Sequence, residues 1–160
     1  MTTLVFDLEA DGLNPTKVWC LVAKYTHRKD FIRFGDPEGI WKYRDQIEEL
    51  FSEADRVVCH NLIDFDRVVL DKLLDINIPF HKCYDSLVIS KVLNPDRELP
   101  AGYSGKSGPH SLDAWGVRVG IGKPEHEDWT QYTDEMLHRC TEDVRINEQT
   151  WFQLLREAKS

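Results

Sequence analysis

Short apolar runs along the chain predict four β-strands. Leu4–Leu8, Val18–Tyr25 and Phe31–Phe34 combine β-branched and aromatic residues, and polar turn segments separate them. Arg56–Cys59 is another short apolar run with polar residues on both sides. The pattern therefore predicts three consecutive strands near the N-terminus and a fourth strand after a segment of different periodicity.

Apolar residues spaced three or four positions apart predict helices in the rest of the chain. Residues 94–109 form the one long predicted loop, which contains three prolines and three glycines. Strands that come first and then alternate with helices predict an α/β fold with a central mixed β-sheet flanked by α-helices. The predicted helices are Ile40–Ala54, Phe65–Ile76, a helix capped by Asp85 or Ser86 that ends at Leu93, Ser111–Val119, and Thr133–Ala158.

Composition adds limits to this picture. A length of 160 residues with 41% hydrophobic residues predicts one folded domain, residues 1–160. Nothing near Met1 has the pattern of a signal peptide or a membrane span, so we expect a cytoplasmic protein. The four cysteines are widely spaced, which favours reduced, mostly buried thiols. The net charge of −8 argues against strong general affinity for a phosphate backbone.

Two carboxylates end the first predicted strand. Asp7 and Glu9 are spaced i and i+2, so both side chains lie on one side of an extended segment. Neighbouring acids on a buried strand repel each other unless a cation lies between them. Oxygen ligands of this kind suit magnesium or manganese, so the spacing predicts a divalent-metal site.

Two further aspartates can complete such a site. Asp66 follows Phe65 at the start of a predicted helix, and Asp143 lies in the last predicted helix. Taken alone, Asp66 is as well explained as an acid favoured by the helix dipole, and Asp64 competes with it as a ligand. Four convergent carboxylates can hold two divalent ions about 4 Å apart, an arrangement suited to phosphoryl displacement.

These acids and their neighbours resemble the DEDD superfamily of DnaQ-like 3′→5′ exonucleases, and the resemblance covers nearly the whole chain. It implies a ribonuclease-H-like fold, two Mg²⁺ or Mn²⁺ ions held by Asp7, Glu9, Asp66 and Asp143, and release of nucleoside 5′-monophosphates. Two other segments are similar to the proofreading domain of T-odd phage DNA polymerases. The matching segments are Asp7-Leu8-Glu9, His60-Asn61 with Phe65-Asp66, Cys83–Ser90, Pro109–Gly116, and His138 with Asp143.

The third motif departs from the phage pattern. The phage relatives carry a tyrosine four residues before the last aspartate, where this chain has Arg139. The other subclass carries a histidine five residues before that aspartate, where this chain has His138. An imidazole titrates near neutrality, so His138 is predicted to take the proton from the attacking water. Residues i and i+5 are about 140° apart on a helix, so this role requires the helix to begin, bend or break near His138.

Several residues are predicted to contact the nucleic acid, each with an ordinary alternative. Leu13 is expected to wedge against the terminal base or simply to pack in its loop. Asn61 either orients the metal-binding aspartate or caps the next helix. Lys106, like Arg97, either contacts phosphates or is a solvated loop charge. The predicted substrate-binding residues are Leu8, Leu13, Asn61, Phe65 and Lys106.

The resulting prediction is a metal-dependent 3′→5′ exonuclease acting on DNA, preferably on single strands or frayed 3′ ends. A phage-like protein of this kind is expected in the cytoplasm of a bacterium or a phage-infected cell, as a monomer, with a separate polymerase as a possible partner. RNA stays open as a substrate, because nothing in the chain visibly reads a 2′-hydroxyl. The alternatives are an inactive nucleic-acid- or protein-binding module and, less favoured, a phosphatase whose second aspartate would stand where Glu9 is.

Overall fold

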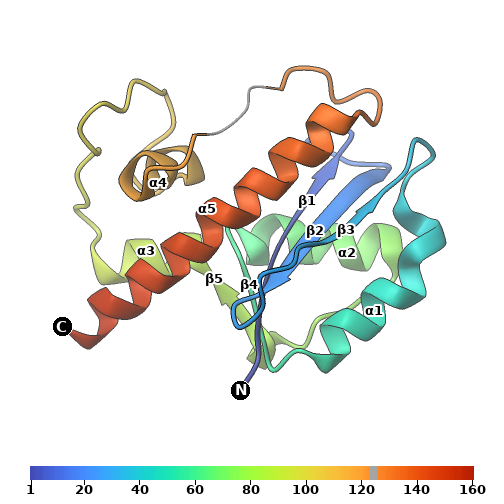
Figure 1. Ribbon diagram of the computed structural model, residues 1–160, viewed down its shortest axis with the longest axis horizontal. Helices are drawn as coiled ribbons and strands as arrows, with labels where there is room; N and C mark the ends of the chain where they lie inside the picture. Colours follow the sequence, from blue (N-terminus) through green and yellow to red (C-terminus); the bar gives the residue numbers. More distant parts are fainter. Residues whose placement is uncertain (123–125) are drawn as a thin grey trace.

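A five-stranded mixed sheet forms the centre of the molecule (Figure 1). A computed structural model describes residues 1–122 and 126–160. The strand order is β3-β2-β1-β4-β5, in which β1 is antiparallel to β2 and parallel to β4. β2 and β3 are antiparallel, and β4 and β5 are parallel. The strands are β1 Thr3–Ala10, β2 Val18–Tyr25, β3 Ile32–Gly35, β4 Arg56–Cys59 and β5 Cys83–Asp85.

Helices fill both sides of this sheet. α1 (Arg44–Glu53) continues a 3₁₀ turn, and α2 (Arg67–Leu74) continues a π-helical turn at Leu62–Asp66. The other helices begin at polar caps: Asp85 precedes α3, Ser111 precedes α4 and Thr133 precedes α5. Their bounds are α3 Ser86–Leu93, α4 Leu112–Val119 and α5 Asp134–Lys159, and the 3₁₀ turns are Ile40–Tyr43 and Phe80–Lys82.

The alternation of side chains along β1 divides the core into two layers. Leu4, Phe6 and Leu8 pack toward α1 and α2, where Phe6 meets Phe51 edge to face with ring centroids 4.9 Å apart. Val5, on the other face, belongs to the apolar layer beneath α5. In Figure 1, α5 crosses in front of the sheet while α1 and α2 lie behind it. Because Asp7 and Glu9 share the period of Val5, both acids face α5.

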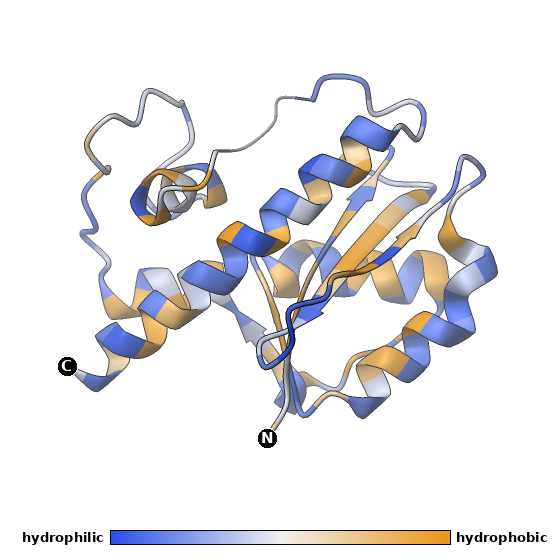
Figure 2. Ribbon diagram, in the orientation of Figure 1, coloured by the Kyte–Doolittle hydropathy of each residue, from blue (hydrophilic) through white to orange (hydrophobic). Residues whose placement is uncertain are grey.

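The C-terminal half of α5 carries a smaller apolar cluster against α4. Trp115 of α4 packs with Ile146 and Leu154 of α5, and all three are buried. The close approach leaves little room for a side chain at Gly116, where an added Cβ would lie 3.2 Å from both the Ile146 Cδ1 atom and the Ile121 carbonyl oxygen. Figure 2 shows hydrophobic and hydrophilic residues alternating along α4 and α5, as expected of helices with one buried side. α4 thus widens the molecule beyond the sheet.

The predicted fold is confirmed in its main features. The mixed sheet, its flanking helices and the capping role of Asp85 are as predicted, and the cysteines are free thiols. The strand β5 was not predicted, because three residues are too few to give a period. The predicted helix from Phe65 also differs, since its first turn is π-helical and begins at Leu62. Among the described residues, no helix is long and apolar enough to cross a membrane.

Candidate active site

Asp7 and Glu9 lie near the C-terminal end of β1, beneath the N-terminal half of α5. The strand carries a register shift between Glu9 and Ala10, which ends regular pairing with β2 just after the two acids. The thiol of Cys140 on α5 lies 3.4 Å from the Asp7 carbonyl oxygen and 3.6 Å from its Oδ2 atom. Ligand atoms of Asp7, Glu9 and Cys140 all lie within 4.8 Å of one another. The strand and the helix therefore enclose one small acidic site.

Asp66 reaches the same place from the opposite side of β1. After β4 the backbone enters the left-handed region at Asn61 (φ 66°), and the π-helical turn follows. This turn leaves Asp64 exposed and buries Asp66, whose carboxylate lies within 4.8 Å of ligand atoms of Asp7 and Cys59. Asp7 is thus shared by two groups of ligand atoms. The structure places Asp66, and not Asp64, beside the first motif.

Asp85 fixes the turn that carries Asp66. Its Oδ1 accepts hydrogen bonds from the Asn61 and Leu87 amides at 2.9 and 3.0 Å, and its Oδ2 accepts from the Ile63 amide at 3.0 Å. One carboxylate therefore caps α3 and holds the start of the π-helical turn. Sequence reasoning found the cap but missed the second role, since Asn61 and Asp85 are distant in the chain. The side chain of Asn61 makes no capping hydrogen bond to this turn.

The electrostatics of this site favour a bound cation. Burial raises the pKa of Asp66 to about 8, with a contribution from the charge of Asp85, although hydrogen bonds from Cys59 and the backbone oppose the shift. Burial also raises the pKa values of Cys59 and Cys140 well above the usual range, as do the charges of nearby carboxylates. Both thiols therefore stay protonated near neutral pH. A divalent cation bound here would offset the repulsion between the neighbouring carboxylates, which is stronger because the site is partly buried.

Asp143 lies on the same face of α5 as Cys140, nearly one turn farther along. Its side chain is buried, and its carboxylate lies outside the two groups of ligand atoms around Asp7. The structure thus brings Asp7, Glu9 and Asp66 together and places Asp143 on the helix face that covers them. The four-carboxylate ligand set stays a prediction.

A polar network lies at Asn147, one turn after Asp143 on the buried face of α5. The amide nitrogen of Asn147 donates to the Ser86 hydroxyl at 2.8 Å, and that hydroxyl lies 2.8 Å from the His60 Nδ1 atom. His60 Nε2 in turn lies 2.8 Å from the His110 carbonyl oxygen. These contacts join the end of β4, the start of α3 and the loop before α4. The segments of the family resemblance at His60, Cys83–Ser90 and Pro109–Gly116 thus meet in one network.

The residues of the third motif point in different directions. α5 begins at Asp134 and continues without a break, and His138 is exposed on it. The guanidinium of Arg139 lies 5.3 Å from the ring centroid of Trp129 and donates to the His126 carbonyl oxygen at 3.4 Å. Within an unbroken helix, His138 is rotated by about 140° from Asp143, whereas Arg139 is rotated by only about 40°. The role of His138 as the base stays a prediction.

An open pocket of about 280 Å³ borders the acids. It contains three of the predicted substrate-binding residues: Leu8, Leu13 and Phe65. Leu13 is 95% exposed, so packing within its own loop does not explain it. Trp129 also lines the pocket and was not assigned to the site from the sequence. Lys106, another predicted contact, is exposed on the loop before α4 and does not line this pocket.

Known proteins with similar sequences are phage DNA polymerases. The chain is 27% identical to the DNA-directed DNA polymerase of Escherichia phage T7 and 29% identical to that of Enterobacteria phage T3. Each match covers 96% of this chain but only 27% of the polymerase, and no protein-family model matches the chain. The predicted resemblance to DnaQ-like 3′→5′ exonucleases is confirmed.

Solved structures agree with a DnaQ-like fold. The family B DNA polymerase of Pyrobaculum calidifontis matches with a TM-score of 0.72 and 15% identity, over 97% of this chain and 24% of that one. Escherichia coli Exonuclease I in complex with a dT13 oligonucleotide matches with a TM-score of 0.60 and 16% identity, over 96% of this chain and 40% of that one. At such low identity these likenesses establish the fold, and the ribonuclease-H-like fold expected from the motifs is confirmed.

Proposed function

We propose that the chain is a metal-dependent 3′→5′ exonuclease that removes nucleotides from DNA, preferably from single strands or frayed 3′ ends. The observation that carries this proposal is the convergence of Asp7, Glu9 and Asp66 from two separate segments. The whole activity of the phage polymerases does not transfer, since this chain spans about a quarter of their length. The polymerase and Exonuclease I likenesses support DNA as the substrate class.

The donor set fits a divalent magnesium or manganese ion. Carboxylate oxygens are the preferred ligands of these hard cations, and buried acids such as Asp66 need one to remain ionised together. Asp7, Glu9 and Asp66 would hold such ions, with Asp143 completing the set for two. When bound, the ions would polarise the scissile phosphate and stabilise charge on the leaving 3′-oxygen.

The remaining residues of the site would bind and orient the 3′ end. Leu8, Phe65 and Trp129 form an apolar wall that suits the face of a terminal base, and Leu13 is exposed beside it. Asp11 holds the loop of Leu13 by accepting from the amides of Thr16 and Lys17 at 2.8 and 3.2 Å. In the proposed reaction His138, which is exposed, would take the proton of the attacking water, a role that requires α5 to bend or break near this residue when the strand binds.

The direct test is digestion of 5′-labelled single- and double-stranded DNA and RNA oligomers with magnesium or manganese. We expect progressive shortening from the 3′ end of single-stranded DNA, release of 5′-monophosphates, and frequent dissociation between cuts. Asp7→Asn should lower the rate by about 1,000-fold, because metal stabilisation contributes several kcal/mol and each 1.4 kcal/mol is tenfold.

The matched control is Asp30→Asn, which removes an exposed carboxylate from the turn between β2 and β3. It should digest DNA at the parental rate. Undiminished hydrolysis by Asp7→Asn would contradict the proposed site. If the parent binds oligomers without shortening any of them under these conditions, the alternative of an inactive binding module is favoured instead.

A further inference from the structure

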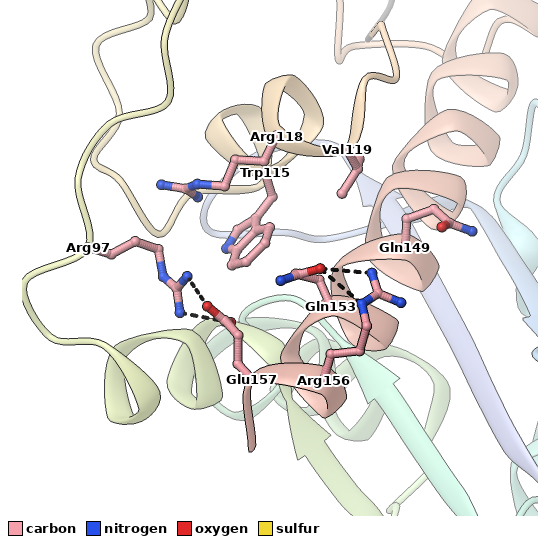
Figure 3. A pocket seen from close by; sticks show the side chains of 8 residues that line it. All are labelled: Arg97, Trp115, Arg118, Val119, Gln149, Gln153, Arg156 and Glu157. Atoms are coloured by element: carbon pink, nitrogen blue, oxygen red, sulfur yellow. Dashed lines mark hydrogen bonds and ion pairs between the residues drawn. The ribbon is translucent and has the colours of Figure 1, made fainter. Parts of the chain in front are cut away.

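A second pocket lies at the other end of α5, away from the acids (Figure 3). Its volume is about 490 Å³, and α4, the C-terminal turns of α5 and the loop before α4 form its walls. Asp143 and Gln153 lie ten residues apart on α5, which is about 15 Å along the helix axis. The two pockets share no lining residue. The second pocket is therefore separate from the carboxylate site.

Arginines dominate the charge of this pocket. Arg97, Arg118 and Arg156 line it, and Glu157 is the one acidic side chain among its described lining residues. The guanidiniums of Arg97 and Arg118 lie 4.8 and 4.6 Å from the ring centroid of Trp115. The buried indole thus holds two cations near each other in a chain whose net charge is −8. The local charge is opposite to that of the whole molecule.

The carboxylate present does not balance these cations. Arg97 is nine-tenths buried and forms a two-pronged ion pair with Glu157, with nitrogen–oxygen distances of 2.8 and 3.3 Å. Arg118 donates from Nη2 to the Glu98 carbonyl oxygen at 2.7 Å, but its buried Nη1 has no hydrogen-bond partner within the described residues, nor has the Arg97 Nε atom. Burial and the charge of Arg97 lower the pKa of Arg118. Buried donors without acceptors are costly, so positive charge is held beside this pocket without full compensation by the described residues.

Donors from α5 complete the wall opposite the buried Arg97 and the half-buried Arg118. The exposed Arg156 donates from Nε and Nη2 to the Gln153 side-chain oxygen at 3.1 and 2.8 Å, and Figure 3 shows both side chains beside the opening. Gln149 lies one turn earlier on the same wall. Forked guanidinium donors match the tetrahedral oxygens of phosphate, and the buried face of Trp115 leaves no surface on which a base can stack.

From these observations we propose that the pocket between α4 and α5 is a phosphate-binding site, distinct from the carboxylate site. Arg97 and Arg118 form its fixed base, and Arg156 closes on the bound group from the rim. The phosphate is either a free phosphate or nucleotide, or a phosphodiester of a DNA strand whose 3′ end lies elsewhere. Binding here requires no divalent metal and no hydrolysis.

The test is calorimetric titration of inorganic phosphate into the full chain in the presence of a metal chelator. We expect saturable binding by the parent and at least tenfold weaker binding by Arg118→Gln and Arg156→Gln. Arg156 is exposed, so its replacement preserves the fold even where loss of Arg118 disturbs Trp115. The matched control is Arg145→Gln on the same helix, which removes a mostly solvated charge paired with Glu142 and should bind phosphate like the parent.

A single-stranded oligonucleotide, titrated under the same metal-free conditions, distinguishes the two sources of phosphate. Weaker binding of both ligands by Arg156→Gln identifies strand phosphates, whereas weaker binding of inorganic phosphate alone identifies a free phosphate or nucleotide. Absence of phosphate binding by the parent, or equal affinities of Arg156→Gln and Arg145→Gln, overturns the proposal. Asp7→Asn should retain full phosphate affinity, so failure of the proposed nuclease function is recognised separately.

Discussion

The two ends of α5 gather side chains of opposite charge. Its N-terminal half covers Asp7 and carries Asp143, so buried carboxylates are gathered there. Its C-terminal half carries Glu157, which holds one of two arginines stacked near Trp115. Each end thus holds side chains of like charge close together: carboxylates at the N-terminal end and guanidiniums at the C-terminal end. The net charge of −8 therefore says little about either site, because local burial and pairing decide which ion each one attracts.

The two ends also differ in how they are supported. The acids are on a central strand and a tight turn held by Asp85, so their positions depend on the sheet. The arginines are on a short helix, a loop and the last turns of α5, outside the sheet. We therefore expect changes at one end to leave the other intact. Three predictions test this independence, from the largest effect to the smallest.

Asp66→Asn should abolish the function of the acidic end alone. We expect exonuclease activity to fall by about 1,000-fold, since a ligand of the metal site is lost, while metal-free phosphate binding stays at the parental affinity. Initial rates on a labelled single strand and calorimetry measure the two effects. Asp64→Asn is the control, because Asp64 is exposed two residues away and should change neither quantity. A loss of phosphate affinity in Asp66→Asn would show that the two ends are coupled.

Substitutions at His138 and Arg139 test which residue of the third motif takes part in proton transfer at the acidic end. If the predicted base is correct, His138→Ala lowers kcat by about 100-fold, the lower range for a general base. Arg139 cannot accept a proton, so Arg139→Ala should act mainly on KM through its stacking on Trp129. Steady-state kinetics over a range of pH separates the two. A change in kcat of less than threefold in His138→Ala would remove that residue from the proton transfer.

Glu157→Gln should change the arginine end in two opposite directions. Loss of the carboxylate frees Arg97, so phosphate should bind about threefold more tightly, whereas the broken ion pair should lower the free energy of unfolding by about 1 kcal/mol. Phosphate calorimetry and urea unfolding measure these effects. Glu135→Gln, which neutralises an exposed acid in the first turn of α5, is the control for the change in net charge. Weaker phosphate binding by Glu157→Gln would contradict the view that its carboxylate competes with the ligand.

Much of the fold and part of the site follow from local pattern. The strand that carries Asp7 and Glu9 begins with a continuous apolar run, and the two acids follow at i and i+2, so its position and the common side of both acids were predictable. Helices were predicted to start at Ser111 and Thr133, and in the structure both residues cap the helices that follow, α4 and α5. The family motifs then related Asp66 and Asp143 to the first pair.

What the sequence did not predict depends on contacts between distant segments. Cys59 and Cys140 were expected to be buried, but nothing near them in the chain indicated that their thiols lie against the carboxylates. Arg97 lies in the long loop at residues 94–109, where a solvated charge is the default expectation; in the structure it is buried against Trp115 and Glu157. Its partner lies sixty positions away, beyond the range of any periodicity.

The π-helical turn at Leu62–Asp66 makes the acidic site sensitive to chain length as well as to residue identity. Deleting one residue from this turn would convert it to an α-helical turn. The carboxylate of Asp66 would then be rotated by about 100° around the helix axis. Every acid of the motif would still be present, in the same order and with nearly the same spacing. A search for the sequence motif would still match such a chain, although the carboxylate of its Asp66 would no longer face Asp7. Natural insertions and deletions between Asn61 and Arg67 are therefore as informative about lost activity as a substitution of Asp66 itself.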